Sequence, residues 1–171
     1  MDILHFQKAL MAEVENILKD IITINPDGER HIGVNVYKQF LPKVVNDDED
    51  MSQFFPYAIV RVDESNTPDD FTPWLTTVDI LFGVYDADEY MGGHDHITIM
   101  IQRVVNRFSQ EALLDKKYRC ESAMDWAIQD EDTFPYFFGL VQLKFNLPKI
   151  GRSEPIYGRQ KTGGYGYEGY C

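Results

Sequence analysis

The stretch "LTTVDILFGVYDADEYMGGHDHITIMIQRVVNRF", residues 75–108, contains the change of period that decides the fold. In residues 75–86 the side chains alternate and both sets are mostly apolar, which is typical of a strand in the centre of a sheet. The set that we expect to face the core is Val78, Ile80, Phe82 and Val84. From residue 94 to 108 the apolar spacing changes to three and four, which predicts a helix whose buried face is formed by Ile97, Met100, Ile101, Val104 and Phe108.

The loop between this strand and this helix gathers residue types that bind metals, namely Asp86, Asp88, Glu89, His94, Asp95 and His96. On a helix, residues two apart point in nearly opposite directions, so His94 and His96 do not share a metal as an i, i+4 pair does. Asp95 suits an N-cap or first-turn acid facing the helix dipole. Tyr90 stands where a calcium loop needs its third ligand. We therefore predict a polar connection with no bound metal and no cofactor.

The rest of the chain supplies the partners of this strand and helix. Residues 2–22 carry an apolar stripe at helical spacing, with Asp2 as the N-cap and "NPDG" (25–28) as the stop signal. Alternating or β-branched runs predict further strands at 32–40, 57–62, 123–129 and 136–147, the last two forming a hairpin. The expected fold is α+β, a mostly antiparallel sheet with helices packed on one face, in the order α-β-β-β-α-β-β.

One such domain is expected over residues 1–150, followed by a flexible tail rich in glycine and tyrosine at 151–171. The core is predicted to rest on a set of buried apolar residues from the two central elements and the last hairpin: Val78, Ile80, Phe82, Ile97, Ile101, Val104, Trp126 and Phe145.

Composition narrows the function. The chain has 171 residues, 44% apolar, with a net charge of −12, so its surface repels nucleic-acid phosphates and sequence-specific nucleic-acid binding is not expected. Cys120 and Cys171 match no metal-ligand or redox spacing and are expected to be free thiols. The first 21 residues carry charges every few positions, which fits neither a signal peptide nor a membrane span, so we expect a soluble intracellular protein with no membrane partner.

The sequence lacks several motifs that are typical of catalytic and cofactor-binding sites. It contains no G-x-S-x-G elbow, no phosphate-binding loop, and no G-x-G-x-x-G after a strand. No catalytic residue is therefore predicted, and a binding or structural protein is favoured over an enzyme.

Three stretches resemble the tail-completion, or tail-terminator, proteins of long-tailed bacteriophages. They are "GVYD" (83–86) at the end of the central strand, "DWAI" (125–128), and "FPYFFG" (134–139). The resemblance covers residues 55–148, and its motifs are structural. It implies a virion protein without enzymatic activity, located in the tail and neck and in the host cytoplasm during assembly. Such a protein forms a homo-oligomeric ring, typically a hexamer, that caps the head-proximal end of the tail tube and joins it to the head. Its partners are other copies of itself, the tail tube protein and a neck or connector protein.

In a ring each subunit uses two different surfaces, one for each neighbour. We expect one surface at an acidic block, opposed by basic groups on the other: Asp47, Asp48, Glu49 and Asp50 against Lys116, Lys117 and Arg119. Two alternatives remain open. One is a head-completion or minor capsid or connector protein. The other is a metal-dependent enzyme that uses Asp86, Asp88, His94 and His96.

Overall fold

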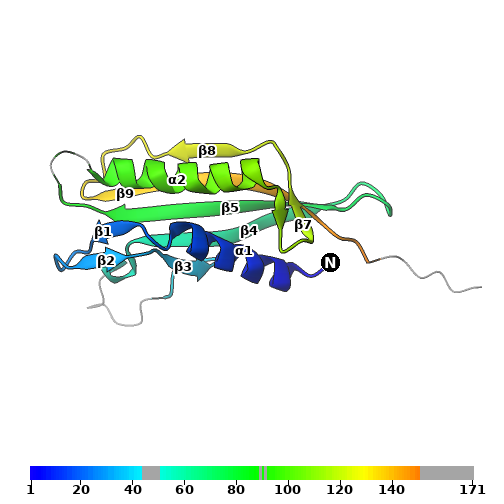
Figure 1. Ribbon diagram of the computed structural model, residues 1–171, viewed down its shortest axis with the longest axis horizontal. Coiled ribbons are helices and arrows are strands. Elements are labelled where there is room, and N and C mark those ends of the chain that lie inside the picture. Colours follow the sequence, from blue (N-terminus) through cyan, green and yellow to red (C-terminus); the bar gives the residue numbers. More distant parts are fainter. Residues whose placement is uncertain (44–50, 89, 91, 151–171) are drawn as a thin grey trace, which may run out of the picture.

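The computed structural model describes residues 1–43, 51–88, 90 and 92–150 (Figure 1). Its helices are α1 (Ile3–Leu18), α2 (Gly92–Gln110) and a short 3₁₀ helix, η1 (Met51–Phe54). Its strands are β1 (Ile22–Ile24), β2 (Arg30–Ile32), β3 (Asn35–Lys38), β4 (Tyr57–Asn66), β5 (Trp74–Tyr85), β6 (Leu113–Leu114), β7 (Tyr118–Cys120), β8 (Asp125–Ile128) and β9 (Tyr136–Leu147).

One large sheet forms the centre of the molecule. Its strand order is β3-β4-β5-β9-β7-β6, and β8 pairs with β9 further along the same side as β7. β5 and β9 are antiparallel over their whole length, from the pair Trp74 and Leu147 to the pair Tyr85 and Tyr136. Only β3 and β4 pair in parallel among the described strands. The predicted α+β class with a mostly antiparallel sheet is confirmed.

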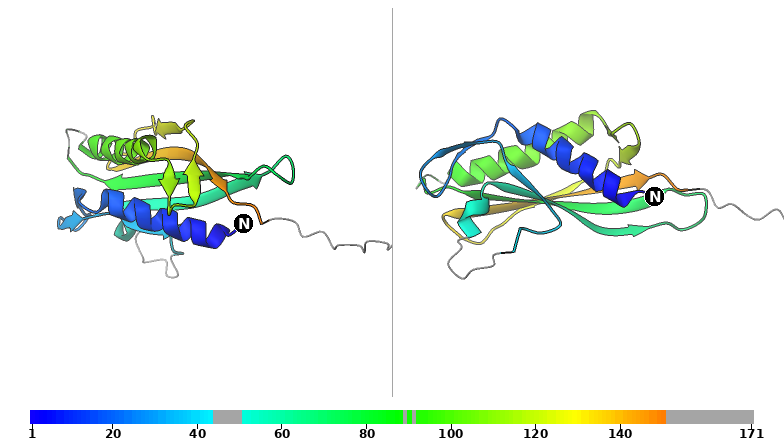
Figure 2. Two further views of the ribbon diagram at one scale, coloured as in Figure 1. Left: turned by 45° about the vertical axis from the view of Figure 1, so that its right-hand side comes forward. Right: turned by 90° about the horizontal axis from the view of Figure 1, so that it is seen from below.

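Both helices pack on the same face of this sheet (Figure 2). Alternation in β5 turns one set of side chains toward them, and the central predicted core residue, Phe82, is 1% exposed. The helix α2 buries the predicted stripe, and α1 adds its own apolar residues to the same core, Phe6, Leu10, Val14 and Leu18. The buried face of α2 and the inward face of β5 are therefore as predicted.

The opposite face of the sheet carries a second, smaller apolar cluster. Phe55, Tyr57 and Ile59 are its buried members, and η1 with the chain around it packs against them. The Phe55 ring lies 4.9 Å from the Tyr57 ring and 5.1 Å from the Tyr136 ring. Aromatic side chains thus cover the end of the sheet where β4 and β9 begin and β5 ends.

The first helix begins as predicted and ends earlier. The Asp2 side chain accepts a hydrogen bond from the backbone N–H of His5 at 3.0 Å, as an N-cap does. The prediction that "NPDG" ends the helix is wrong, because α1 stops at Leu18 and this stretch instead turns the hairpin between β1 and β2. In that turn Gly28 adopts a φ of +80°, and the Asn25 side chain accepts from the N–H of Glu29.

The expected element order α-β-β-β-α-β-β is incomplete, because the structure adds short strands before β4 and after α2, and two further expectations need correction. The single strand expected at 32–40 is two strands, because Gly33 between them adopts a φ of +89° and turns the chain. The hairpin of β6 and β7 was not predicted. Trp126 was placed in the core but is 60% exposed, because β8 lies at the edge of the sheet and α2 does not cover it fully.

Candidate functional site

The metal-like loop between β5 and α2 is organised by its own backbone. Asp86 accepts a hydrogen bond from the N–H of Asp88 at 2.9 Å, and Asp88 accepts one from the N–H of Tyr90. His96 Nδ1 lies 3.5 Å from an Asp86 carboxylate oxygen, whereas His94 lies 3.9 Å from its neighbour Asp95. The two histidines therefore face different partners.

The same loop forms the start of α2, as the sequence predicted. Residues 92–96 are its first turn, and Asp95 is the acid of that turn. Among the residues that the structure describes, no three His, Cys, Asp or Glu side chains are arranged to hold a metal ion. Glu89 lies outside the described residues.

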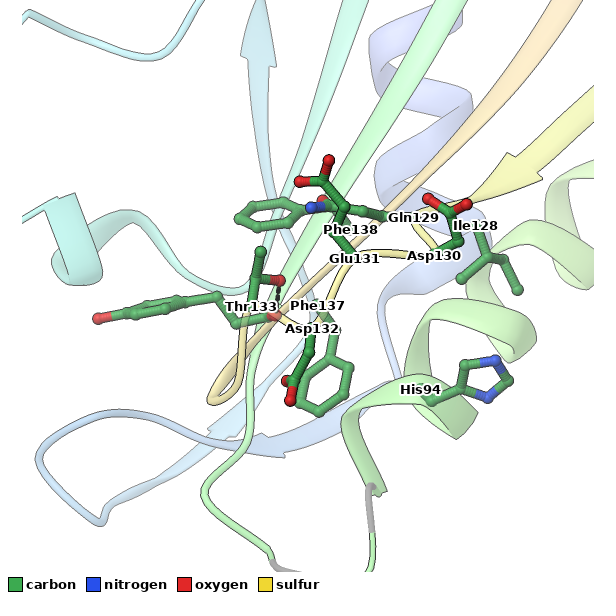
Figure 3. A pocket seen from close by; sticks show the side chains of 10 residues that line it. His94, Ile128, Gln129, Asp130, Glu131, Asp132, Thr133, Phe137 and Phe138 are labelled. Carbon is green, nitrogen blue, oxygen red and sulfur yellow. Dashed lines mark hydrogen bonds between the residues drawn. The ribbon is translucent and has the colours of Figure 1, made fainter.

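A pocket of about 290 Å³ lies next to this loop, under the turn from β8 to β9. Asp130, Glu131 and Asp132 line its rim, with His94 across from them (Figure 3). In Figure 3 the three carboxylates point away from one another. The pocket is thus acidic at its rim, without a point at which the carboxylates converge.

The predicted interface residues fall into two groups. The acidic block of Asp47, Asp48, Glu49 and Asp50 lies outside the described residues. Lys116 and Lys117 lie in the turn between β6 and β7, Arg119 lies in β7, and all three are exposed. Within the described part of the chain none of these three side chains forms an ion pair, so this hairpin presents unneutralised positive charge at one end of the sheet order.

The hairpin of β1 and β2 was missed by the sequence analysis, and it has an unusual distribution of side chains. Its outer face exposes Ile22, Ile24 and Ile32, at 43%, 52% and 61%. Its inner face is polar: Thr23 is 3% exposed, and the residue paired with it is His31. The signal was present in the alternation of "ITI" and "RHI" around the "NPDG" turn.

Contacts with the helices hold this hairpin in place. Gly33 donates its N–H to the Ile21 carbonyl at 2.7 Å, which closes the base of the hairpin. Arg103 of α2 donates to the Ile17 carbonyl at 3.3 Å and forms an ion pair with Asp20, just before β1. That hydrogen bond to Arg103 lowers the pKa of the Asp20 carboxyl group. These contacts therefore fix the hairpin that exposes Ile22, Ile24 and Ile32.

The opposite side of the molecule presents the edge strand β8. Trp126 stands opposite Val141, which is fully buried beneath the helices, so the indole is on the helix side of the sheet. Gln129 donates its N–H to the Phe138 carbonyl at 3.1 Å. Because inward and outward backbone groups alternate along an edge strand, those of Trp126 and Ile128 point away from β9.

The three stretches that carry the family resemblance meet in one place. β5 and β9 place Gly83 opposite Phe138, and β8 places Ile128 opposite Gly139. The glycines are required by close packing: a Cβ atom on Gly83 would lie 2.4 Å from the Tyr57 ring, and one on Gly139 would lie 2.6 Å from Ile97 Cγ2. We call this region, formed by residues 83–86, 125–128 and 134–139 with the helix above them, the motif junction.

No protein-family model and no curated protein matches the chain. Neither helix in the described part of the chain has the length and hydropathy that a membrane span requires.

Proposed function

We propose that this protein is a structural virion protein of a long-tailed bacteriophage, a tail terminator. Copies of it form a ring, a hexamer, on the head-proximal end of the tail tube. The ring ends tube growth and offers a surface to the neck or connector protein. It acts by binding, without catalysis or a cofactor.

The main support for this proposal is the packing of the motif junction. The quoted motifs are separated by up to about 50 residues in the chain, yet they form adjacent strands under one helix. Their glycines sit where a side chain would collide with Tyr57 or Ile97. A resemblance at such positions concerns how β5, β8, β9 and α2 pack together, and packing of this kind is shared by proteins of one fold. At Gly83 and Gly139 it therefore supports a shared architecture more strongly than the exposed residues of "DWAI" do.

The charge of the chain also supports a role around a DNA channel. The end of the molecule at the motif junction carries Asp86 and Asp88 on the loop after β5 and Asp132 on the turn before β9. Acidic groups repel DNA phosphates, so a ring lined by them lets DNA pass without sticking. This arrangement suits a protein that works beside DNA and does not bind its sequence.

Deleting the gene from the phage tests the proposal. We expect tails of abnormal length, or tails that fail to join heads, in electron micrographs of the lysate. Purified protein added to the defective tails is expected to restore joining. Tails of normal length that join heads without this protein would refute the assignment, and labelling found only on the head side would indicate a head-completion protein instead.

A further inference from the structure

The outer face of the β1–β2 hairpin is apolar without being part of the core. Ile22 pairs with Ile32 across the two strands, and Ile24 stands two residues along on the same side. Side chains paired across an antiparallel ribbon lie next to each other, so the three isoleucines form one continuous surface. Soluble proteins usually turn the polar side of such a ribbon outward. Here the inner side is the polar one, which indicates that the outer side is covered in the functional state.

The helix α2 extends this surface. Ile99 is 41% exposed and lies four residues before Arg103, which reaches Asp20 at the base of the hairpin. Residues four apart share a face of a helix, so Ile99 is on the side of α2 that looks toward the hairpin. We call Ile22, Ile24, Ile32 and Ile99 the isoleucine face.

A second apolar surface lies on the opposite side of the molecule. Among the described strands β8 pairs with β9 alone, and it carries an exposed indole, at Trp126, and outward backbone groups. In Figure 1 β8 runs along one side of α2, and the β1–β2 hairpin lies on the other. Figure 2 shows the same separation from another direction. The two surfaces differ from each other and lie on different sides of α2, and a head-to-tail contact between identical subunits uses two different surfaces of this kind.

One charge on the isoleucine face is complementary to the residues around Trp126, and the turn of the same hairpin also exposes two acids, Asp27 and Glu29. Arg30 is exposed and pairs with Ile24, so it stands on the isoleucine face. The exposed charged residues next to Trp126 are acidic, Asp125 before it and Asp130 and Glu131 after it. With a net charge of −12, two copies repel each other at long range. A contact between copies therefore needs an apolar centre, and a local pair of opposite charges helps to orient it.

We infer that the isoleucine face of one subunit receives the β8 edge, with Trp126, of a second copy of this chain. The indole covers the isoleucines, and Arg30 meets the acidic residues that flank β8. Repetition of this one contact around an axis gives a closed ring. The inference rests on the proposed function only in its requirement that copies assemble.

Cysteine pairing tests this contact directly. In a Cys171→Ser background the remaining native thiol, Cys120, is 3% exposed. One chain carries Ile24→Cys and another carries Trp126→Cys. We expect the two chains, mixed and oxidised, to form a disulfide-linked pair at least about tenfold more abundantly than either chain alone, which corresponds to about 1.4 kcal/mol of preference. Phe71→Cys, at a residue 95% exposed in the loop between β4 and β5, is the matched control and is expected to give background only.

A second variant measures the contact without a disulfide. Ile32→Asp changes a side chain that is 61% exposed, so the urea midpoint of unfolding is expected to stay unchanged while self-association, measured by sedimentation, weakens by about tenfold or more. Three results would overturn the inference. One is that Ile24→Cys pairs with itself as well as with Trp126→Cys. The others are that oligomers form without pairing of the two cysteines, or that the chain stays monomeric up to its solubility limit. If the cysteines do not pair but the deletion phage shows a clear tail defect, the inferred contact is refuted and the proposed function is retained. If the cysteines pair but the deletion phage shows no tail defect, the contact is supported and the proposed function is refuted.

Discussion

Replacing Gly139 with alanine tests the packing of the motif junction. The new Cβ atom would lie 2.6 Å from Ile97 Cγ2 and 3.0 Å from Ile101 Cδ1. Both isoleucines are buried on α2, at 0% and 5% exposed, so neither can swing into solvent. The helix must therefore shift away from β9, or the isoleucines must leave their preferred rotamers.

The expected magnitude follows from two opposing effects. Overpacking of a buried site costs about 1–3 kcal/mol. Alanine in a strand loses less backbone entropy on folding than glycine, which returns about 0.5–1 kcal/mol. We therefore expect Gly139→Ala to lower the free energy of unfolding by about 1–2 kcal/mol, measured by urea unfolding followed by circular dichroism.

A double-mutant cycle assigns this loss to Ile97. Ile97→Ala alone creates a cavity and is expected to cost about 2–5 kcal/mol. In the double variant the methyl group of residue 139 occupies part of that cavity, so the combined loss is expected to fall short of the sum by about 1–3 kcal/mol. Leu147→Ala is the control, because Leu147 is buried in the same strand eight residues away, about 26 Å at the rise of a strand. Additive losses for Gly139→Ala with Ile97→Ala, or a stabilising Gly139→Ala, would refute the packing argument.

Three further outcomes are expected. Phe82→Ala lowers the free energy of unfolding by about 3–5 kcal/mol in urea, because the ring is 1% exposed in the centre of β5; a loss below about 1 kcal/mol would contradict that placement. Replacing both His94 and His96 with alanine is expected to leave the melting temperature and the secondary structure nearly unchanged, because among the described residues neither histidine belongs to a group of three potential metal ligands. A large fall in melting temperature that added zinc modulates would favour the enzyme alternative. Burial raises the pKa of the Cys120 thiol to about 12 from an ordinary value of 9.0, so the unfolded thiol ionises first and stability falls as pH rises above 9. The melting temperature of the wild type is expected to fall more steeply between pH 9 and 10.5 than that of Cys120→Ala, and parallel curves would contradict this.

The long, strongly patterned elements were predictable from the sequence. The strand β9 was predicted with both of its ends, because alternation continues without interruption from Tyr136 to Leu147. The inward face of β5 was predicted from the same alternation, and α2 was predicted from its apolar spacing of three and four. The short elements were not. β6 has two residues and β7 has three, and they form because tertiary contacts with β9 and α1 support them, which no local period records.

The candidate site was predicted less well than the fold. The basic residues Lys116, Lys117 and Arg119 are exposed, and residues 92–96 form the start of α2 with Asp95 in its first turn, as predicted; the surfaces on the β1–β2 hairpin and on β8 were not predicted. The β1–β2 hairpin was missed because Ile21 and the residues before it continue the helical spacing of α1, so the expected helix was extended to Ile22. Glycine at position 33, with its positive φ, then separates the hairpin from β3.

The two surfaces proposed for assembly escaped the sequence analysis for one physical reason. A pattern of apolar residues shows that water is excluded from them, but it does not show whether the same chain or another copy excludes it. Trp126 was expected in the core as an apolar residue of a hairpin strand, and the structure exposes 60% of it. The single subunit does not bury the apolar side chains of Ile22, Ile24 and Ile32, because their hairpin turns its polar face inward. Contacts between copies are therefore expected at apolar residues that the fold of one chain leaves exposed.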